Sequence, residues 1–181
     1  RTPGRKGMKE KGKRKKAGVQ EFMPLLTGLS GNLQSCAFSG HREIPEDLDV
    51  RKLKEIIRDL AGRGATTFYF GGARGFDLLA AECVLALKRE MPEVTLVACI
   101  PCGGQEKYYP EEDKKRYARA LEESDEVVIL SEKYYRGCMH RRNDYMAENA
   151  DALIACCRKE TGGTAYTVKK FRRKGKPVFG V

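Results

Sequence analysis

Residues 66–87 read TTFYFGGARGFDLLAAECVLAL, and this stretch decides the fold. It opens with residues 66–70, a β-branched and aromatic run typical of a buried strand. Three glycines follow within five residues, and residues 76–87 then form an apolar segment of helical length. A strand that passes through a short glycine-rich turn into an apolar helix is half of a βαβ unit.

The rest of the chain repeats this alternation. Before this stretch, one helical stripe carries the apolar residues Val50, Leu53, Ile56, Ile57 and Leu60. The pattern predicts strands at 35–38, 66–70, 94–100, 126–130, 152–156 and 177–181, and helices at 50–60, 76–87, 111–121, 139–149 and 164–173. Such alternation favours a parallel sheet with right-handed crossovers. We therefore predict a single α/β, Rossmann-like doubly wound domain of about six mostly parallel strands, with helices on both faces, over residues 34–181.

The positive charge of the chain is concentrated at its start. The formal net charge is +10, and residues 1–20 hold nine basic residues and one acid, so they contribute 9 − 1 = +8. These residues carry no apolar periodicity, and we predict that 1–33 form a disordered basic tail and linker. The first residue is Arg1, so Met8 or Met23 is a candidate start, and a non-native tail and a functional basic arm both stay open.

Targeting signals and disulfides are not indicated. No run of 18 apolar residues and no secretory pattern occurs, which favours a cytoplasmic protein without a membrane span. Seven cysteines lie mostly in apolar runs, which predicts buried, reduced thiols. Cys99 and Cys102 have C-x-x-C spacing, but Cys99 lies inside a predicted strand and no second pair follows, so no metal site is predicted.

Small and polar residues follow the predicted strands, where doubly wound sheets bind their ligands. Residues 71–77 form a glycine-rich strand-to-helix turn that would let backbone N–H groups approach an anion. It is neither a Walker loop nor G-x-G-x-x-G, and a turn without a ligand fits as well. Asp77 either complements the helix dipole or contacts a ribose or base. Residues 161–164 repeat the same glycine-turn pattern before the last helix.

Two further segments complete the predicted site. His41 and Arg42 follow the first strand, and a guanidinium suits a phosphate or carboxylate. Residues 134–143 combine aromatics with arginines, so they either stack a base and hold phosphate or form a solvated helix start. The predicted nucleotide-binding residues are Ser39, Gly40, His41, Arg42, Gly71, Gly72, Ala73, Gly75, Phe76, Asp77, Arg141, Asn143, Thr161, Gly162, Gly163 and Thr164.

Taken together, these motifs resemble the YpsA/YoqJ-like family of the SLOG superfamily. The residues that carry the resemblance are 38–42, 71–77 with 80–82, the charged segment 109–124, the helix 143–149 and the turn 161–164. The resemblance spans roughly residues 35–181. It implies a Rossmann-like fold and a nucleotide or nucleotide-derived ligand, and it relates the chain to LOG-type phosphoribohydrolases and to the DNA-processing protein DprA.

One departure bears on the reaction. The LOG-type motif P-G-G-x-G-T-x-x-E ends in a catalytic Glu, whereas residues 161–168 read TGGTAYTV. Asp77 and Glu82 remain as replacement carboxylates. We therefore expect a sensor-type binding protein for a nucleotide or an NAD- or ADP-ribose-like molecule. The alternatives are a hydrolase that cleaves an N-glycosidic or phosphoester bond and a DprA-like nucleic-acid-binding module. A homo-oligomer stays open, and nucleic acid is not the favoured partner.

Overall fold

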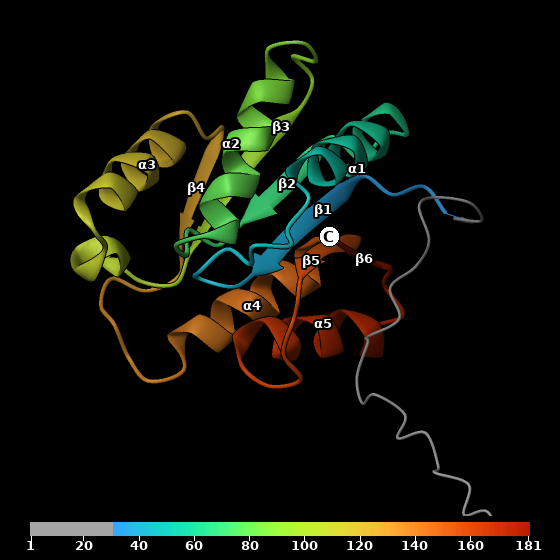
Figure 1. Cartoon of the computed structure of the whole chain (residues 1–181). Coiled ribbons are helices and arrows are strands. Elements are labelled where there is room, and N and C mark those ends of the chain that lie inside the picture. The colour runs from blue at the N-terminus through green and yellow to red at the C-terminus, as the bar shows by residue number, and fades with distance from the viewer. Residues whose placement is uncertain (1–30) are drawn as a thin grey trace, which may run out of the picture.

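The computed structural model describes residues 31–181, and these fold into a six-stranded sheet with helices on both sides (Figure 1). The strands are β1 (Ser35–Gly40), β2 (Thr67–Phe70), β3 (Thr95–Ile100), β4 (Glu126–Ile129), β5 (Ala152–Cys156) and β6 (Val178–Gly180). The helices are α1 (Val50–Gly62), α2 (Phe76–Lys88), the 3₁₀ helix η1 (Gln105–Tyr108), α3 (Glu111–Glu122), α4 (Cys138–Asn149) and α5 (Gly163–Arg173).

Every strand pair in the sheet is parallel, and the strand order is β4-β3-β2-β1-β5-β6. The chain moves outward from β1 through β2 and β3 to β4, and then returns across the sheet to place β5 on the other side of β1. The order of the strands therefore reverses between β1 and β5, which is where doubly wound sheets open a crevice for ligands.

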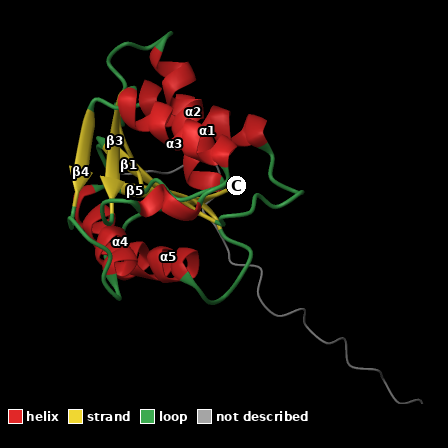
Figure 2. Cartoon of the chain, turned by 90° about the vertical axis from the view of Figure 1, so that its left-hand side faces the viewer, coloured by secondary structure: helices red, strands yellow, loops and turns green. Residues whose placement is uncertain are grey.

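The two faces of the sheet have separate cores, because side chains alternate along each strand. Cys36 and Phe38 of β1 lie in the larger core, beneath α1, α2 and α3. Ala37 lies in the smaller core with residues of α4 and α5, such as Met146 and Phe171. Figure 2 shows the two helical layers on opposite sides of the strands.

The predicted fold class is confirmed, and each predicted strand and helix lies within about two residues of an observed one. The sequence pattern missed η1, which is a short turn without an apolar stripe. The predicted tail 1–33 lies mostly outside the described residues, although Leu33 packs against the larger core. Within residues 31–181, the helices are too short or too polar to cross a membrane.

Candidate functional site

A pocket of about 900 Å³ opens over the carboxyl ends of β1, β2 and β3 and reaches the start of α5. The structure brings nine of the predicted residues into its lining: Ser39, Gly40, His41, Arg42, Ala73, Asp77, Asn143, Gly163 and Thr164. The other predicted residues, Gly71, Gly72, Gly75, Phe76, Arg141, Thr161 and Gly162, do not line it. The site therefore lies where the strand order reverses and extends toward β3.

The glycine-rich loop after β2 is held by the protein itself. Asp77 Oδ2 accepts hydrogen bonds from the N–H groups of Gly71 at 3.1 Å and Ala73 at 3.4 Å. The Gly71 carbonyl accepts from the Arg142 guanidinium and from Gln105 Nε2, the latter at 3.1 Å. The N–H groups of Gly71 and Ala73 are already paired, so they are not free donors for a bound anion.

Gly75 explains why this loop needs glycine. Its φ is +74°, and a Cβ there would lie 2.6 Å from the His41 carbonyl oxygen and closer still to the backbone of Arg42. The neighbouring Phe76 N–H donates to the same His41 carbonyl at 3.1 Å. The close approach that glycine permits here is an approach of two loops of this chain, which joins the β2–α2 turn to the segment after β1.

Asp77 is a buried carboxyl in the pocket lining, with an exposed fraction of 4%. Burial raises its pKa to about 6, while the Arg142 guanidinium and the N–H groups of Ala73 and Gly71 oppose the rise. Near neutral pH this carboxyl therefore exists in both protonation states, so it can accept or donate a hydrogen bond.

Arg142 is a pocket-lining residue that the sequence did not predict. It is 6% exposed, lines the pocket, and donates from Nε to Asn143 Oδ1 at 2.8 Å. The predicted Arg141 is exposed instead and donates to the Leu130 carbonyl at 3.2 Å. Helical spacing distinguishes the two, because Arg142 lies between Cys138 and Met146 on the buried face of α4.

His41 lines the pocket, but its Nε2 is engaged by the protein. The Arg158 N–H donates to it at 2.8 Å, so the segment after β1 is joined to the segment after β5. Partial burial lowers the pKa of His41, and the neighbouring Lys159 and Arg158 add to this effect. A neutral His41 imidazole thus links the segments that follow β1 and β5.

Arg42 is a cation of the pocket lining. Among residues 31–181 its side chain has no hydrogen bond or ion pair, whereas Arg74 pairs with Asp113 at 2.9 Å. Gly163 and Thr164 begin α5 in the same lining, and α5 starts without a side-chain cap. A guanidinium and an uncapped helix N-terminus both favour an anion.

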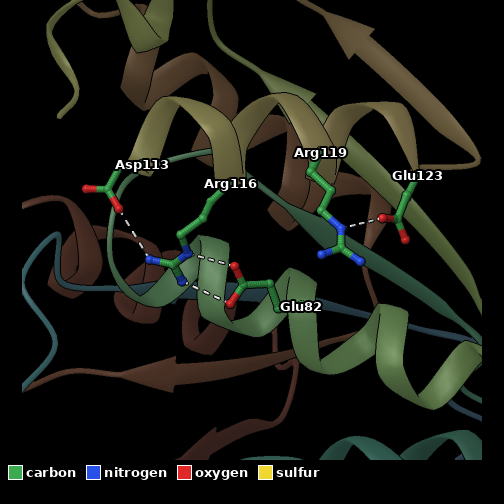
Figure 3. A network of polar contacts seen from close by, with 5 residues as sticks. All are labelled: Glu82, Asp113, Arg116, Arg119 and Glu123. Atoms are coloured by element: carbon green, nitrogen blue, oxygen red, sulfur yellow. Dashed lines mark hydrogen bonds and ion pairs between the residues drawn. The ribbon is translucent and has the colours of Figure 1, made fainter. Parts of the chain in front are cut away.

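Glu82, the second predicted catalytic carboxylate, does not line this pocket. Figure 3 shows it bound to Arg116 through both oxygens, at 2.6 Å and 3.0 Å, between α2 and α3. Arg116 also contacts Asp113 at 3.2 Å. Glu82 therefore helps to hold two helices together, which is the role its contacts show.

The pocket lining also holds aromatic side chains. Tyr108 of η1 and Tyr134 of the β4–α4 segment line it with exposed fractions of 87% and 69%. His140 also lines it and stacks on Tyr166, with ring centroids 4.5 Å apart. The lining thus combines cations such as Arg42 and Lys107 with exposed aromatic rings.

The chain is similar to a family model, to a curated relative and to solved structures. The model of the YspA SLOG family matches residues 47–177. A UPF0398 protein of Halalkalibacterium halodurans is 28% identical over 158 residues, covering 84% of this chain and 82% of that protein.

Two solved structures of DNA processing protein A share the fold. The protein from Streptococcus pneumoniae matches with a TM-score of 0.60 at 20% identity, over 82% of this chain and 50% of that one. The protein from Helicobacter pylori, described with a single-stranded DNA binding mode, matches with a TM-score of 0.60 at 22% identity, over 82% of this chain and 65% of that one. The chain thus spans half to two thirds of these two proteins.

Proposed function

Because this chain belongs to the YspA SLOG family, we propose that its pocket binds a nucleotide or a nucleotide derivative. The observation that carries the proposal is one pocket of about 900 Å³ whose lining holds both the cation Arg42 and the exposed rings of Tyr108 and Tyr134. A nucleotide carries the matching groups, a phosphate and a stacking base.

The proposal places the phosphate group beside Arg42. Arg42 has no competing partner among residues 31–181, and Gly163 and Thr164 present the uncapped start of α5 beside the same space. The glycine loop 71–75 was expected to share this role, but its Gly71 and Ala73 N–H groups are taken by Asp77. We therefore assign the phosphate to Arg42 and α5.

In the proposal the base stacks on the exposed tyrosines, and Asp77 contacts the sugar. Tyr108 and Tyr134 offer exposed rings on which a base can stack. Asp77 and Asn143 line the pocket with polar atoms, which suits the hydroxyl groups of a ribose. A larger ligand that contains a nucleotide, such as NAD or ADP-ribose, has the same chemistry and stays within the proposal.

Binding of AMP, ADP-ribose and NAD to the full chain tests the proposal, with adenosine as the ligand that lacks phosphate. Thermal shift and calorimetry should show binding of at least one phosphorylated ligand, and adenosine should bind at least tenfold more weakly. Arg42→Ala should lower the affinity for the phosphorylated ligand by more than tenfold, because it removes a charge-assisted hydrogen bond. Arg51→Ala is the matched control, since Arg51 is an exposed arginine on α1 outside the pocket. Equal binding by both variants contradicts the proposal.

A second candidate ligand is single-stranded nucleic acid. The expectation that nucleic acid is not a partner is weakened, because the Helicobacter pylori protein of the same fold binds single-stranded DNA. Exposed Tyr108 and Tyr134 beside Arg42 and Lys107 are the combination of stacking rings and cations that such ligands use. A titration with an oligonucleotide at several salt concentrations separates the two, because only the oligonucleotide should show a steep loss of affinity with salt.

Hydrolysis of the bound nucleotide is a further possible activity, and it is tested with the same ligands. Of the two carboxylates predicted as catalytic, Asp77 lines the pocket and Glu82 does not. A carboxyl with a pKa of about 6 is suited to donate a proton to a leaving group near neutral pH. Release of free base from AMP that disappears in Asp77→Asn would convert the binding proposal into an enzymatic one.

A further inference from the structure

The last helix, α5, and the chain on either side of it carry a concentrated positive charge. Residues 158–176 hold eight basic residues and one acid, which gives a net charge of 8 − 1 = +7. Residues 31–157 hold 18 basic and 22 acidic residues, which gives a net charge of 18 − 22 = −4. The positive charge of residues 31–181 therefore belongs to one short segment, and the rest of the domain is mildly acidic.

The way its charges are arranged distinguishes α5 from the other helices of residues 31–181, because α5 alone contains no acidic residue. In α3, cations pair with acids one turn away, as Lys114 does with Glu111 at 2.8 Å. In α5, basic residues lie three and four positions apart instead, as Lys169 and Arg173 do. Like charges at this spacing repel each other and destabilise a helix, so the charge pattern of α5 does not serve the stability of the helix.

Contacts within the domain use only part of this charge. The negative end of the α5 dipole is equivalent to about half an elementary charge. Lys170 pairs with Asp144 at 3.2 Å, and Lys169 donates to a backbone carbonyl at 3.3 Å. Within residues 31–181, the exposed side chains of Arg173 and Lys174 form no hydrogen bond or ion pair. The helix therefore presents more positive charge than its own surroundings neutralise.

The apolar residues of α5 take no part in its exposed surface. Ala165, Val168 and Phe171 are buried in the smaller core, with exposed fractions of 2% or less. A helix that binds a membrane surface exposes apolar side chains beside its cations. A protein interface likewise has an apolar or aromatic centre. A surface made of cations alone favours nucleic acid, because contacts to phosphates supply the sequence-independent part of its binding.

We propose that this helix binds the phosphate backbone of nucleic acid without reading the base sequence. The cationic surface of α5 consists of the exposed residues Lys169, Arg172, Arg173 and Lys174. Two cations at the ends of the segment have other partners, since Arg158 pairs with Asp47 at 3.1 Å and Lys176 binds carbonyl groups of α4. The four residues of the surface do not line the pocket, so this site is separate from the proposed nucleotide site. A duplex, whose bases are already stacked, should bind to it.

Binding of a fluorescent, mixed-sequence DNA duplex to the full chain, measured by anisotropy, tests the proposal. The triple variant Lys169→Gln, Arg173→Gln and Lys174→Gln should bind the duplex at least tenfold more weakly than the wild type at low salt. The slope of log affinity against log salt should become shallower by about 2–3, because each phosphate contact contributes about 0.9. The substituted side chains are exposed, so the thermal midpoint should change little.

A matched triple variant removes exposed cations from α1 and α3. It carries the substitutions Arg51→Gln, Lys54→Gln and Lys115→Gln. Its net charge equals that of the α5 variant, and both variants keep the basic residues of 1–30. It should bind the duplex within threefold of the wild type. Equal losses of affinity in the two triple variants would overturn the proposal, and so would an α5 variant that binds like the wild type.

Two further measurements separate the cationic surface of α5 from other binding modes. Arg42→Ala should bind the duplex like the wild type. Loss of duplex binding in Arg42→Ala but not in the α5 variant would place nucleic acid in the pocket, which overturns this proposal and supports the second candidate ligand. Vesicles of anionic phospholipid should bind more weakly than the duplex. Binding of vesicles without binding of the duplex would assign the surface to a membrane and would also overturn the proposal.

Discussion

Asp77 and Arg142 bind the two backbone polar groups of Gly71, although they come from helices on opposite faces of the sheet. Asp77, on α2, accepts the Gly71 N–H at 3.1 Å, and Arg142, on α4, donates to the Gly71 carbonyl. Both side chains are buried and both line the pocket. The glycine-rich turn is thus the point where the two helical layers are joined through polar contacts at the edge of the sheet.

Gly71→Ala should destabilise the protein by about 1–3 kcal/mol, because the added methyl group overpacks a filled space. A Cβ at this position would lie 2.8 Å from Asp77 Oδ2 and would also collide with the Arg142 guanidinium. Gly62→Ala is the control, since a Cβ there meets nothing within 4 Å at the end of α1. Chemical denaturation measures both variants, and an equal response of the two would contradict this account of Gly71.

The pH dependence of stability should carry the signature of Asp77. Its pKa is raised from 3.8 to about 6 in the folded protein, so between these values the folded state binds more protons than the unfolded state. Stability from this group is present at low pH and is lost as the pH rises toward 6, by about 3 kcal/mol in total. Asp77→Asn keeps an acceptor for the Gly71 and Ala73 N–H groups and removes the titration.

Denaturation of the wild type and Asp77→Asn across this range measures the effect. The stability difference, variant minus wild type, should become more positive by about 2 kcal/mol between pH values near 4 and near 7. A difference that stays constant with pH would show that the Asp77 carboxyl keeps an ordinary pKa in the folded protein.

His41 should change the pH dependence of stability in the direction opposite to Asp77. Its pKa lies below the ordinary 6.5, and its Nε2 accepts the Arg158 N–H only while it is unprotonated. The unfolded state therefore binds protons more readily below pH 6.5, and stability falls as the pH decreases through that range. His41→Gln supplies an acceptor that does not titrate, so this part of the pH dependence should disappear.

Nuclear magnetic resonance titration of the imidazoles checks the direction of this shift. The chain has two histidines, so His140→Gln leaves the His41 signal alone in the spectrum. A His41 signal that titrates at or above the ordinary value would contradict the hydrogen bond to Arg158.

Lys176 should stabilise α4 by binding the carbonyl groups at its C-terminus. Its Nζ donates to the carbonyl groups of Ala147 at 2.6 Å and Ala150 at 2.7 Å, at the helix C-terminus. A cation there pairs with free carbonyls and the negative end of the helix dipole. Lys176→Met should cost about 1–2 kcal/mol in a denaturation experiment. Lys174→Met, which changes an exposed neighbour, should cost less than half as much.

Much of the pocket lining could be predicted from the sequence, but the contacts within it could not. Ser39, Arg42, Asp77, Asn143 and Thr164 were predicted because each follows a strand, and parallel strands end at one edge of the sheet. Arg142 was passed over for its neighbour Arg141, although the buried face of α4 runs through Cys138, Arg142 and Met146. Residues of η1 such as Gln105 and Tyr108 carried no periodic signal.

By itself, the sequence determined the alternating strands and helices, because apolar periodicity and glycine turns are local properties of the chain. It also determined which segments end at the carboxyl edge of the sheet. Only the tertiary structure decided what those segments contact there. The backbone of Gly71 is held by α2 and α4, because partners distant in sequence are set by the packing of the two helical layers.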